Sequence, residues 1–123
     1  MDAAYVFAVR FRVEPAAGGL SLDPEEFETR LSRTADAPGE EGWLFFRDNL
    51  WRGDLADPAG FRELTADALG VPVDSVEYRA LETDREHYDA LREAIGDDLA
   101  PFNADSVDEV VSKYLGSSVE VQD

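Results

Sequence analysis

Residues 4–13, near the start of the chain, divide into two faces with a period of two. One face is made of large apolar residues, namely Tyr5, Phe7, Val9, Phe11 and Val13. The other face carries Val6, Ala8, Arg10 and Arg12. Because successive side chains of a strand point to opposite faces, the two-residue period predicts a half-buried strand over residues 4–13.

The next pattern admits two interpretations. Residues 14–22 are rich in turn formers and predict a loop, and Asp23-Pro24 predicts the start of a helical turn. Beyond it, Phe27 and Leu31 fit one face of a helix, whereas Phe27, Thr29 and Leu31 fit one face of a strand. We favour a strand over 27–34.

Three later segments also have the character of strands. The most aromatic run of the chain, residues 42–51, predicts a central strand. Spaced apolar residues indicate a further strand over about 74–82. Residues 118–123 are expected to form either a short strand or a tail.

Start and stop signals mark three helices. Asp57-Pro58 supplies a cap and a first-turn proline, and Gly70 a terminator, so a helix is expected over 58–69. Two capping boxes, in which a Ser or Thr precedes a Glu by three positions, open two more helices. They are Thr83-x-x-Glu86, for a helix over 84–95 ending at Gly96, and Ser106-x-x-Glu109, for a helix over 107–115 ending at Gly116.

Strands crowd the first half of the chain and helices the second. This order predicts an α+β fold, a mainly antiparallel sheet of about four strands with three helices packed on one face. The length of 123 residues suits one hydrophobic core, so residues 1–123 are expected to form a single domain.

The charge balance of the chain indicates the solvent environment in which the protein is expected to work. Asp and Glu number 28 against 11 Lys and Arg, which gives a net charge of −17, and Lys113 is the one lysine. Such a chain stays soluble where multimolar salt screens its self-repulsion, so we expect a halophilic, haloarchaeal protein rather than an ordinary acidic domain. An acidic surface repels nucleic acid, and no apolar segment is long enough to span a membrane. We therefore expect a cytoplasmic protein that binds neither nucleic acid nor membranes.

Few residues suit catalysis or metal binding. The chain has no cysteine and a single histidine, His87, which excludes thiolate sites, histidine pairs and a serine triad. We expect His87 to be a solvated surface group. Asp97, Asp98 and Asp105 lie close in sequence but lack the spacing of a calcium loop. No catalytic residue, metal or cofactor is predicted.

The arginines concentrate in the first half, where residues 1–62 have a net charge of −5 against −12 for residues 63–123. We expect Arg10 and Arg12, with Arg30, Arg33, Arg47 and Arg52, to form a patch on the open face of the sheet that binds a phosphate or carboxylate. The alternative is that these arginines pair across strands with Glu28, Asp48 and Asp54.

The segment 42–53 does not follow a clean pattern. As one strand, it would carry Trp43, Arg47 and Trp51 on one face and Asp48, Leu50 and Arg52 on the other, so neither face is polar. Local patterning often fails where a protein functions, and Trp beside Arg allows cation–π contact. The alternative is that both faces are covered, by helices and by arginine stems.

The triplet Leu50-Trp51-Arg52 lies within the string Trp43-Leu-Phe-Phe-Arg-Asp-Asn-Leu-Trp-Arg-Gly53. With the acidic composition and the C-terminal stretch from Asn103 to Ser118, this string resembles the LWR-salt family of small haloarchaeal proteins over nearly the whole chain. The resemblance implies no activity, cofactor or catalytic residue, and only the triplet corresponds to the family's namesake motif.

Two functions remain. The first is a non-catalytic interaction module that docks a partner protein or a second copy through residues 42–53, since Trp and Arg are enriched in interface hot spots. The second is a small-molecule (anion) binding protein or small enzyme that uses the arginine patch, with Asp48 or Asp54 as a carboxylate of perturbed pKa. We favour the first.

Overall fold

In the computed structural model, residues 2–13 and 26–122 are described, and they form a four-stranded sheet with helices. The strand order is β2 (Glu26–Thr34), β1 (Ala3–Arg12), β5 (Val73–Asp84) and β6 (Val119–Gln122). β1 pairs antiparallel with both neighbours, and β6 pairs parallel with β5. The predicted α+β class and the strand over 27–34 are therefore confirmed, and the C-terminal residues form a strand rather than a tail.

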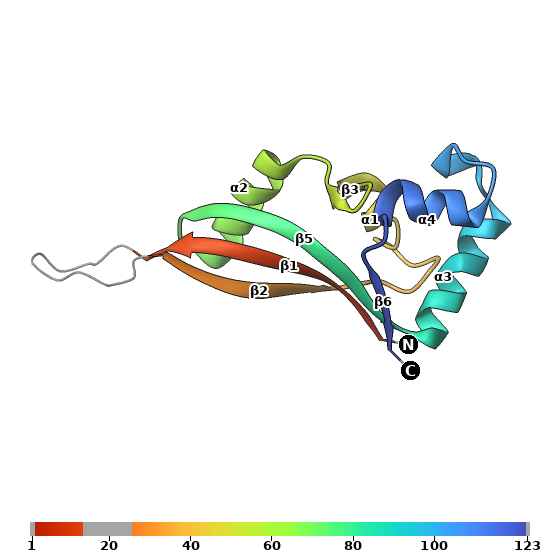
Figure 1. Cartoon of the computed structure of the whole chain (residues 1–123), viewed down its shortest axis with the longest axis horizontal. Coiled ribbons are helices and arrows are strands. Elements are labelled where there is room, and N and C mark those ends of the chain that lie inside the picture. The colour runs from red at the N-terminus through yellow and green to blue at the C-terminus, as the bar shows by residue number, and fades with distance from the viewer. Residues whose placement is uncertain (1, 14–25, 123) are drawn as a thin grey trace, which may run out of the picture.

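One face of this sheet carries the core. Tyr5, Phe7 and Val9 of β1 are buried opposite Leu81, Tyr78 and Val76 of β5. The helices that cover these residues are α1 (Phe45–Asn49), α2 (Pro58–Leu69), α3 (Arg85–Asp97) and α4 (Val107–Leu115). Figure 1 shows α2 near one end of the long strands and the other three helices gathered near the opposite end. The predicted packing of helices on one sheet face is confirmed.

The opposite face of the sheet carries charges that alternate with small residues. Val6 and Ala8 are buried there, although they point away from the helices. Long charged side chains from neighbouring strands lie around them and form cross-strand pairs, including Arg30 with Glu82 at 3.1 Å. The aliphatic stems of such residues can shield small apolar groups while their charges stay in water.

Helix α2 begins and ends as the sequence predicts. Asp57 Oδ1 accepts a hydrogen bond from the Gly60 amide at 3.1 Å, and Gly70 adopts a left-handed conformation after the last turn. Helix α4 also starts as predicted, because Ser106 Oγ accepts from the Glu109 amide at 3.2 Å.

The predicted limits of α3 are wrong at both ends. Asp84, not Thr83, caps the helix, because its Oδ1 accepts from the His87 amide at 2.7 Å while Thr83 is buried in β5. Gly96 lies inside α3 instead of terminating it. A Cβ at Gly96 would come within 3.2 Å of Val107 Cγ2, so this glycine allows α3 to approach the start of α4.

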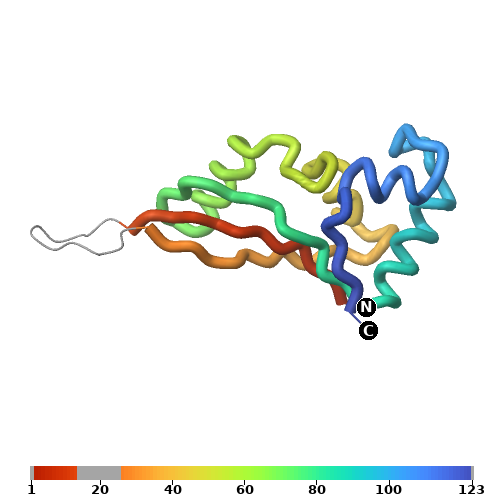
Figure 2. The backbone as a smooth tube through the Cα atoms, in the orientation of Figure 1, coloured from red at the N-terminus to blue at the C-terminus, as the bar shows by residue number. Residues whose placement is uncertain are grey.

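The predicted central strand over 42–51 is also wrong. The segment forms the short helix α1, then β3 (Leu50–Trp51), which pairs antiparallel with β4 (Asp54–Leu55). This two-stranded hairpin is separate from the main sheet. Its place beside α4 can be followed in the backbone trace of Figure 2.

Two predictions fall on the remaining part of the chain. The loop over 14–22 and residues 23–25 of the predicted helical turn at 23–26 lie outside the described residues. The remaining residue of that predicted turn, Glu26, is the first residue of β2.

Candidate functional site

The hairpin turn at Arg52-Gly53 positions the candidate site. Trp51 pairs with Asp54, which leaves a two-residue turn with φ of 52° at Arg52 and 83° at Gly53. Positive φ at both central residues matches a type I′ hairpin turn, whose twist suits two antiparallel strands. Glycine adopts this backbone freely, but arginine does so at a cost. The surroundings of Arg52 must therefore hold it there.

Helix α4 supplies that hold. The amide of Arg52 donates to the carbonyl oxygen of Lys113 at 2.8 Å, and the amide of Gly53 donates to that of Tyr114 at 3.0 Å. Carbonyl groups in the last turn of a helix lack partners within the helix. The hairpin turn thus satisfies the C-terminal end of α4, and α4 in turn fixes the turn.

Two glycines make this contact close. A Cβ at Gly116, where φ is 60°, would lie 3.1 Å from the carbonyl carbon and oxygen of Arg52. A Cβ at Gly53 would lie 3.2 Å from the carbonyl oxygen of Leu115. Because the neighbouring atoms are backbone, neither contact can relax by side-chain rotation. The hairpin and the end of α4 therefore form one rigid unit.

The three residues of the Leu50-Trp51-Arg52 triplet have different environments. Leu50 is 1% exposed and belongs to the core, whereas Trp51 is 45% exposed. The Trp51 ring meets Tyr114 edge to face, with ring centroids 6.0 Å apart. A buried leucine thus anchors the hairpin, and the following tryptophan remains half open to solvent.

Two cations flank the Trp51 ring. Arg52 Cζ lies 5.6 Å and Lys113 Nζ 5.8 Å from its centroid, both within the range of cation–π attraction. Lys113 Nζ also donates to the carbonyl oxygens of Phe102 and Asn103, at 2.9 and 3.2 Å. These bonds fix the ammonium group beside the indole.

A groove of about 590 Å³ opens beside this arrangement. It is lined by Trp51, Arg52, Glu109, Ser112, Lys113 and Gly116. The Glu109 carboxylate is already engaged, since its Oε2 accepts from the Asp105 amide at 2.9 Å. We call this feature the Trp51 groove. It combines an aromatic face, two cations and a hydroxyl group, a set that suits a carboxylate attached to an apolar body.

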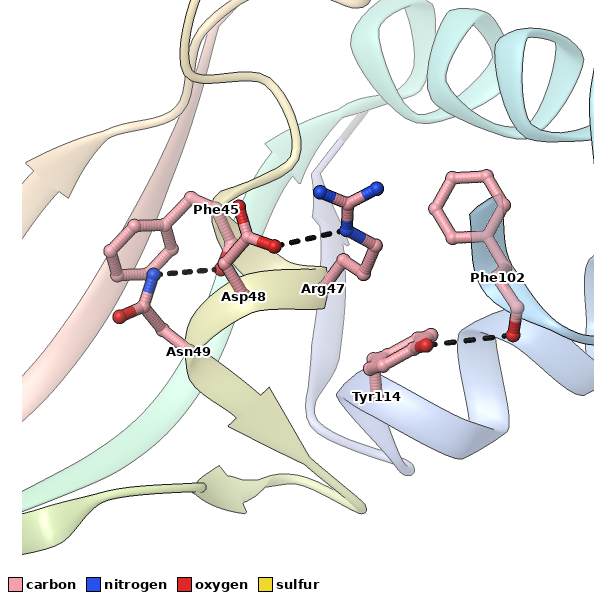
Figure 3. Close-up of polar contacts among 6 residues, drawn as sticks. All are labelled: Phe45, Arg47, Asp48, Asn49, Phe102 and Tyr114. Atoms are coloured by element: carbon pink, nitrogen blue, oxygen red, sulfur yellow. Dashed lines mark hydrogen bonds and ion pairs between the residues drawn. The ribbon is translucent and has the colours of Figure 1, made fainter. Parts of the chain in front are cut away.

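The first half of the segment supports the hairpin from within. Phe46 is fully buried and stacks on Phe102 with ring centroids 5.8 Å apart, and Trp43 meets both rings edge to face. Figure 3 shows the polar contacts of this region, including Asn49 Nδ2 donating to the Phe45 carbonyl at 3.1 Å. Trp43 is therefore packed against the core, unlike Trp51.

The arginines expected to form one patch lie in two places. Arg10 and Arg12 are on the open face of the sheet, where they pair with Glu28 at 3.7 Å and Asp74 at 2.9 Å. Arg47 Nε donates to Asp48 Oδ1 at 2.9 Å, on the helical side (Figure 3). Of the six arginines, the groove contains Arg52 alone. The alternative of pairing across strands is found between Arg10 and Glu28, whereas Arg47 pairs with Asp48, its neighbour in α1, and not across strands.

His87 is buried, contrary to the expectation of a surface imidazole. Its side chain is 2% exposed and lies on the inward face of α3 with Leu91 and Ile95. Burial lowers the pKa of His87, and the nearby Asp84 carboxylate opposes this shift with a smaller effect. Hydrogen bonds from the His87 and Asp2 amides lower the pKa of Asp84.

Within residues 2–13 and 26–122, no three His, Cys, Asp or Glu side chains are grouped so as to hold a metal ion. No helix in this part of the chain is long and apolar enough to cross a bilayer.

The geometry gives each residue of the triplet a distinct position, and comparison of the whole chain with known families matches the LWR-salt protein family over residues 1–123. The chain belongs to the LWR-salt family. The function of this family is unknown. No curated protein and no solved structure gives a significant match to the chain.

Sequence reasoning missed the contribution of α4 to the Trp51 groove. Lys113, Ser112 and Glu109 lie about 60 residues from the triplet, so no local pattern joins them. One signal was available, because a single lysine in so acidic a chain indicates a position with a special requirement. Here the lysine holds two carbonyl oxygens and one aromatic face.

Proposed function

We propose that this protein is a non-catalytic interaction module that docks a carboxylate-bearing segment of a partner protein in the Trp51 groove. The observation that carries the proposal is that Trp51 is half exposed and has two cations near its ring, on a chain of net charge −17. Tryptophan and arginine are the residue types that most often dominate interface energy.

A carboxylate fits the groove better than other anions do. The Arg52 guanidinium can bind both oxygens of a carboxylate, and the indole face can pack on the apolar part of the same segment. The acidic chain around the groove repels long phosphate backbones, and phosphate contacts weaken steeply with salt. We place this activity in the cytosol of a halophilic, haloarchaeal cell, on the strength of the acidic composition.

Small-molecule binding is the second candidate, because a groove of about 590 Å³ has the size of a metabolite site. Arg10, Arg12 and Arg47 lie outside this groove, and each already pairs with a carboxylate. An anion in the groove would therefore meet Arg52, Lys113 and Ser112 rather than a cluster of arginines.

The test is a titration followed through the indole N–H signals in NMR, at the lowest KCl concentration that keeps the chain folded. The probes are a capped Leu-Glu-Glu-Leu peptide, its Gln-Gln analogue and inorganic phosphate. We expect the glutamate peptide to shift the Trp51 signal and to leave Trp43 unchanged, and the glutamine peptide to bind at least about tenfold more weakly.

Arg52→Gly is the informative variant, because glycine suits the φ of 52° at this position while the guanidinium is lost. We expect it to weaken binding of the glutamate peptide by about tenfold or more. Arg62→Ala, which removes an exposed arginine of α2, is the control and should bind like wild type. Equal binding of the glutamate and glutamine peptides would contradict the proposal, and an equal response to phosphate would favour a small anion.

A further inference from the structure

We propose that the outer edge of β2 pairs with the same edge of a second copy of this chain, antiparallel and about a two-fold axis through Thr29. This inference rests on β2 and is independent of the Trp51 groove. The edge belongs to the long sheet, on the side opposite β6 (Figure 1).

β2 has an edge open to pairing. It is the terminal strand of the sheet, and no other strand among the described residues pairs with its outer side. Its nine residues match β1 one to one without a register shift, and the strand contains no proline. Natural edge strands are commonly protected by prolines, bulges, short length or charged side chains, and of these β2 has only charged side chains, which are of both signs.

The exposure of β2 is unusual for a strand next to the core. Of its nine residues, only Leu31 is partly buried, and Phe27 is 37% exposed although it lies on the helical side of the sheet and stacks on Phe11. An apolar strip of Phe27, Thr29 and Leu31 is therefore left uncovered along this edge. A second β2 strand with the same strip would extend the sheet and cover part of it.

The sequence of β2 complements itself in one register. A two-fold axis through Thr29 places Phe27 opposite Leu31 of the second copy, and Glu28 opposite its Arg30. Each of these pairs occurs twice, and Thr29 faces its own equivalent. Within each chain Glu28 already pairs with Arg10 and Arg30 with Glu82, so the contacts between copies would extend these exposed ion pairs rather than engage free charges. Apolar, oppositely charged and Thr–Thr pairs across strands are all stabilising.

Neighbouring registers lose this match. An axis through Glu28 would oppose two glutamates, and an axis through Arg30 would oppose two arginines, both of which are unfavourable. A shift of one residue would place Glu28 against Thr29 or Leu31 and bring the helical side of one copy onto the open side of the other. The charges of β2 therefore favour the register through Thr29 over those through Glu28 and Arg30, and in that register the strand complements a second copy of itself.

The interface is a single strand edge, so the dimer is expected to depend on protein concentration. Sedimentation velocity in multimolar KCl should give a mass that rises from one chain to two as concentration increases. Thr29→Lys would place two ammonium groups opposite each other and should keep the protein monomeric. Ser32→Lys, on the same strand but opposite Glu26 of the second copy, should leave the dimer intact.

Because the chain has no cysteine, single cysteines can test the register directly. Thr29→Cys should form an intermolecular disulfide under mild oxidation, since directly opposite Cβ atoms lie about 4.5–5.5 Å apart. Ser32→Cys should not, because the two equivalents would be about 20 Å apart along the strands. A monomer at every concentration, a dimer that survives Thr29→Lys, or equal cross-linking by both cysteines would overturn the proposal. Circular dichroism checks that each variant is folded. If Thr29→Lys does not fold, the comparison of Thr29→Cys with Ser32→Cys tests the proposed register on its own.

Discussion

Leu50, Trp51 and Arg52 are neighbours in sequence, yet each has a different physical role. Leu50 is buried in the core, Trp51 is half exposed, and Arg52 has a backbone conformation that glycine would adopt more easily. The strain at Arg52 is offset by the hydrogen bonds of the turn to α4. Glycine would remove this strain but would also remove the side chain that lines the Trp51 groove.

At the same scale, His87 predicts a pH dependence of stability. Its pKa is lowered in the folded state below the ordinary value of 6.5, so the unfolded chain takes up a proton at higher pH than the folded chain does. The contribution of His87 to the free energy of unfolding should therefore fall as pH decreases from 6.5 toward the folded pKa.

Urea unfolding across this pH range, in multimolar KCl, measures the effect. His87→Gln should show a weaker loss of stability on acidification than wild type, because glutamine does not titrate. The variant keeps the hydrogen bond from the backbone amide of residue 87 to Asp84. The carboxylates contribute equally to both proteins. Parallel pH profiles would mean that the imidazole is not held neutral by burial.

At the scale of the elements, the regular strands and two of the three long helices could be predicted from the sequence. β1 has the period of a strand because large apolar residues line the face that the helices cover, while the other face carries small apolar residues and arginines, and α2 and α4 carry their caps in the sequence. Segment 42–51 could not be predicted in this way. Phe45 and Phe46 are adjacent and both buried, because rings from distant parts of the chain surround the short helix α1.

The burial of His87 was within reach of the sequence. His87, Leu91 and Ile95 are spaced four residues apart, which places them on one face of a helix, and all three are buried. The residues that α4 contributes to the Trp51 groove could not be predicted from the sequence, since their place depends on how the hairpin meets the C-terminal end of α4.

The contact between the hairpin and α4 leads to a second prediction. Gly116→Ala should destabilise the fold by more than Gly70→Ala, although both glycines have positive φ. At Gly70 a Cβ would meet nothing within 4 Å, so only backbone strain of about 1–2 kcal/mol is expected. At Gly116 the backbone, with φ of 60° and ψ of −137°, lies outside the left-handed helical region that Gly70 occupies, and the Cβ would also meet backbone atoms of Arg52 at 3.1 Å, so both effects add to the cost.

Thermal or urea unfolding of the two variants compares these costs. Gly116→Ala should also broaden or shift the Trp51 indole signal in NMR, because the hairpin must move away from α4. Equal losses of stability for both variants, with an unchanged Trp51 signal, would show that the hairpin is not held by this close contact.

At the scale of the whole molecule, charge governs the third prediction. A net charge of −17 repels itself more strongly when the screening length grows from about 3 Å in 1 M salt to about 10 Å in 0.1 M salt. The thermal midpoint should therefore fall on dialysis from multimolar to dilute KCl. The same midpoint in both solutions would contradict adaptation to high salt.

Within segment 42–53, one aromatic residue stabilises the fold and another is proposed to bind a partner. Phe46 is fully buried and Trp51 is 45% exposed, so their truncation should have unequal costs. We expect Phe46→Ala to lower the free energy of unfolding by about 3–5 kcal/mol and Trp51→Ala by about 1–2 kcal/mol. Trp51 would then be available for a partner without being required for the fold.

The most direct test is urea unfolding of these two variants side by side in multimolar KCl. We predict a small loss in the free energy of unfolding for Trp51→Ala and a large loss for Phe46→Ala. A loss for Trp51→Ala as large as that for Phe46→Ala would show that Trp51 serves the core, and the proposed docking groove would lose its main support.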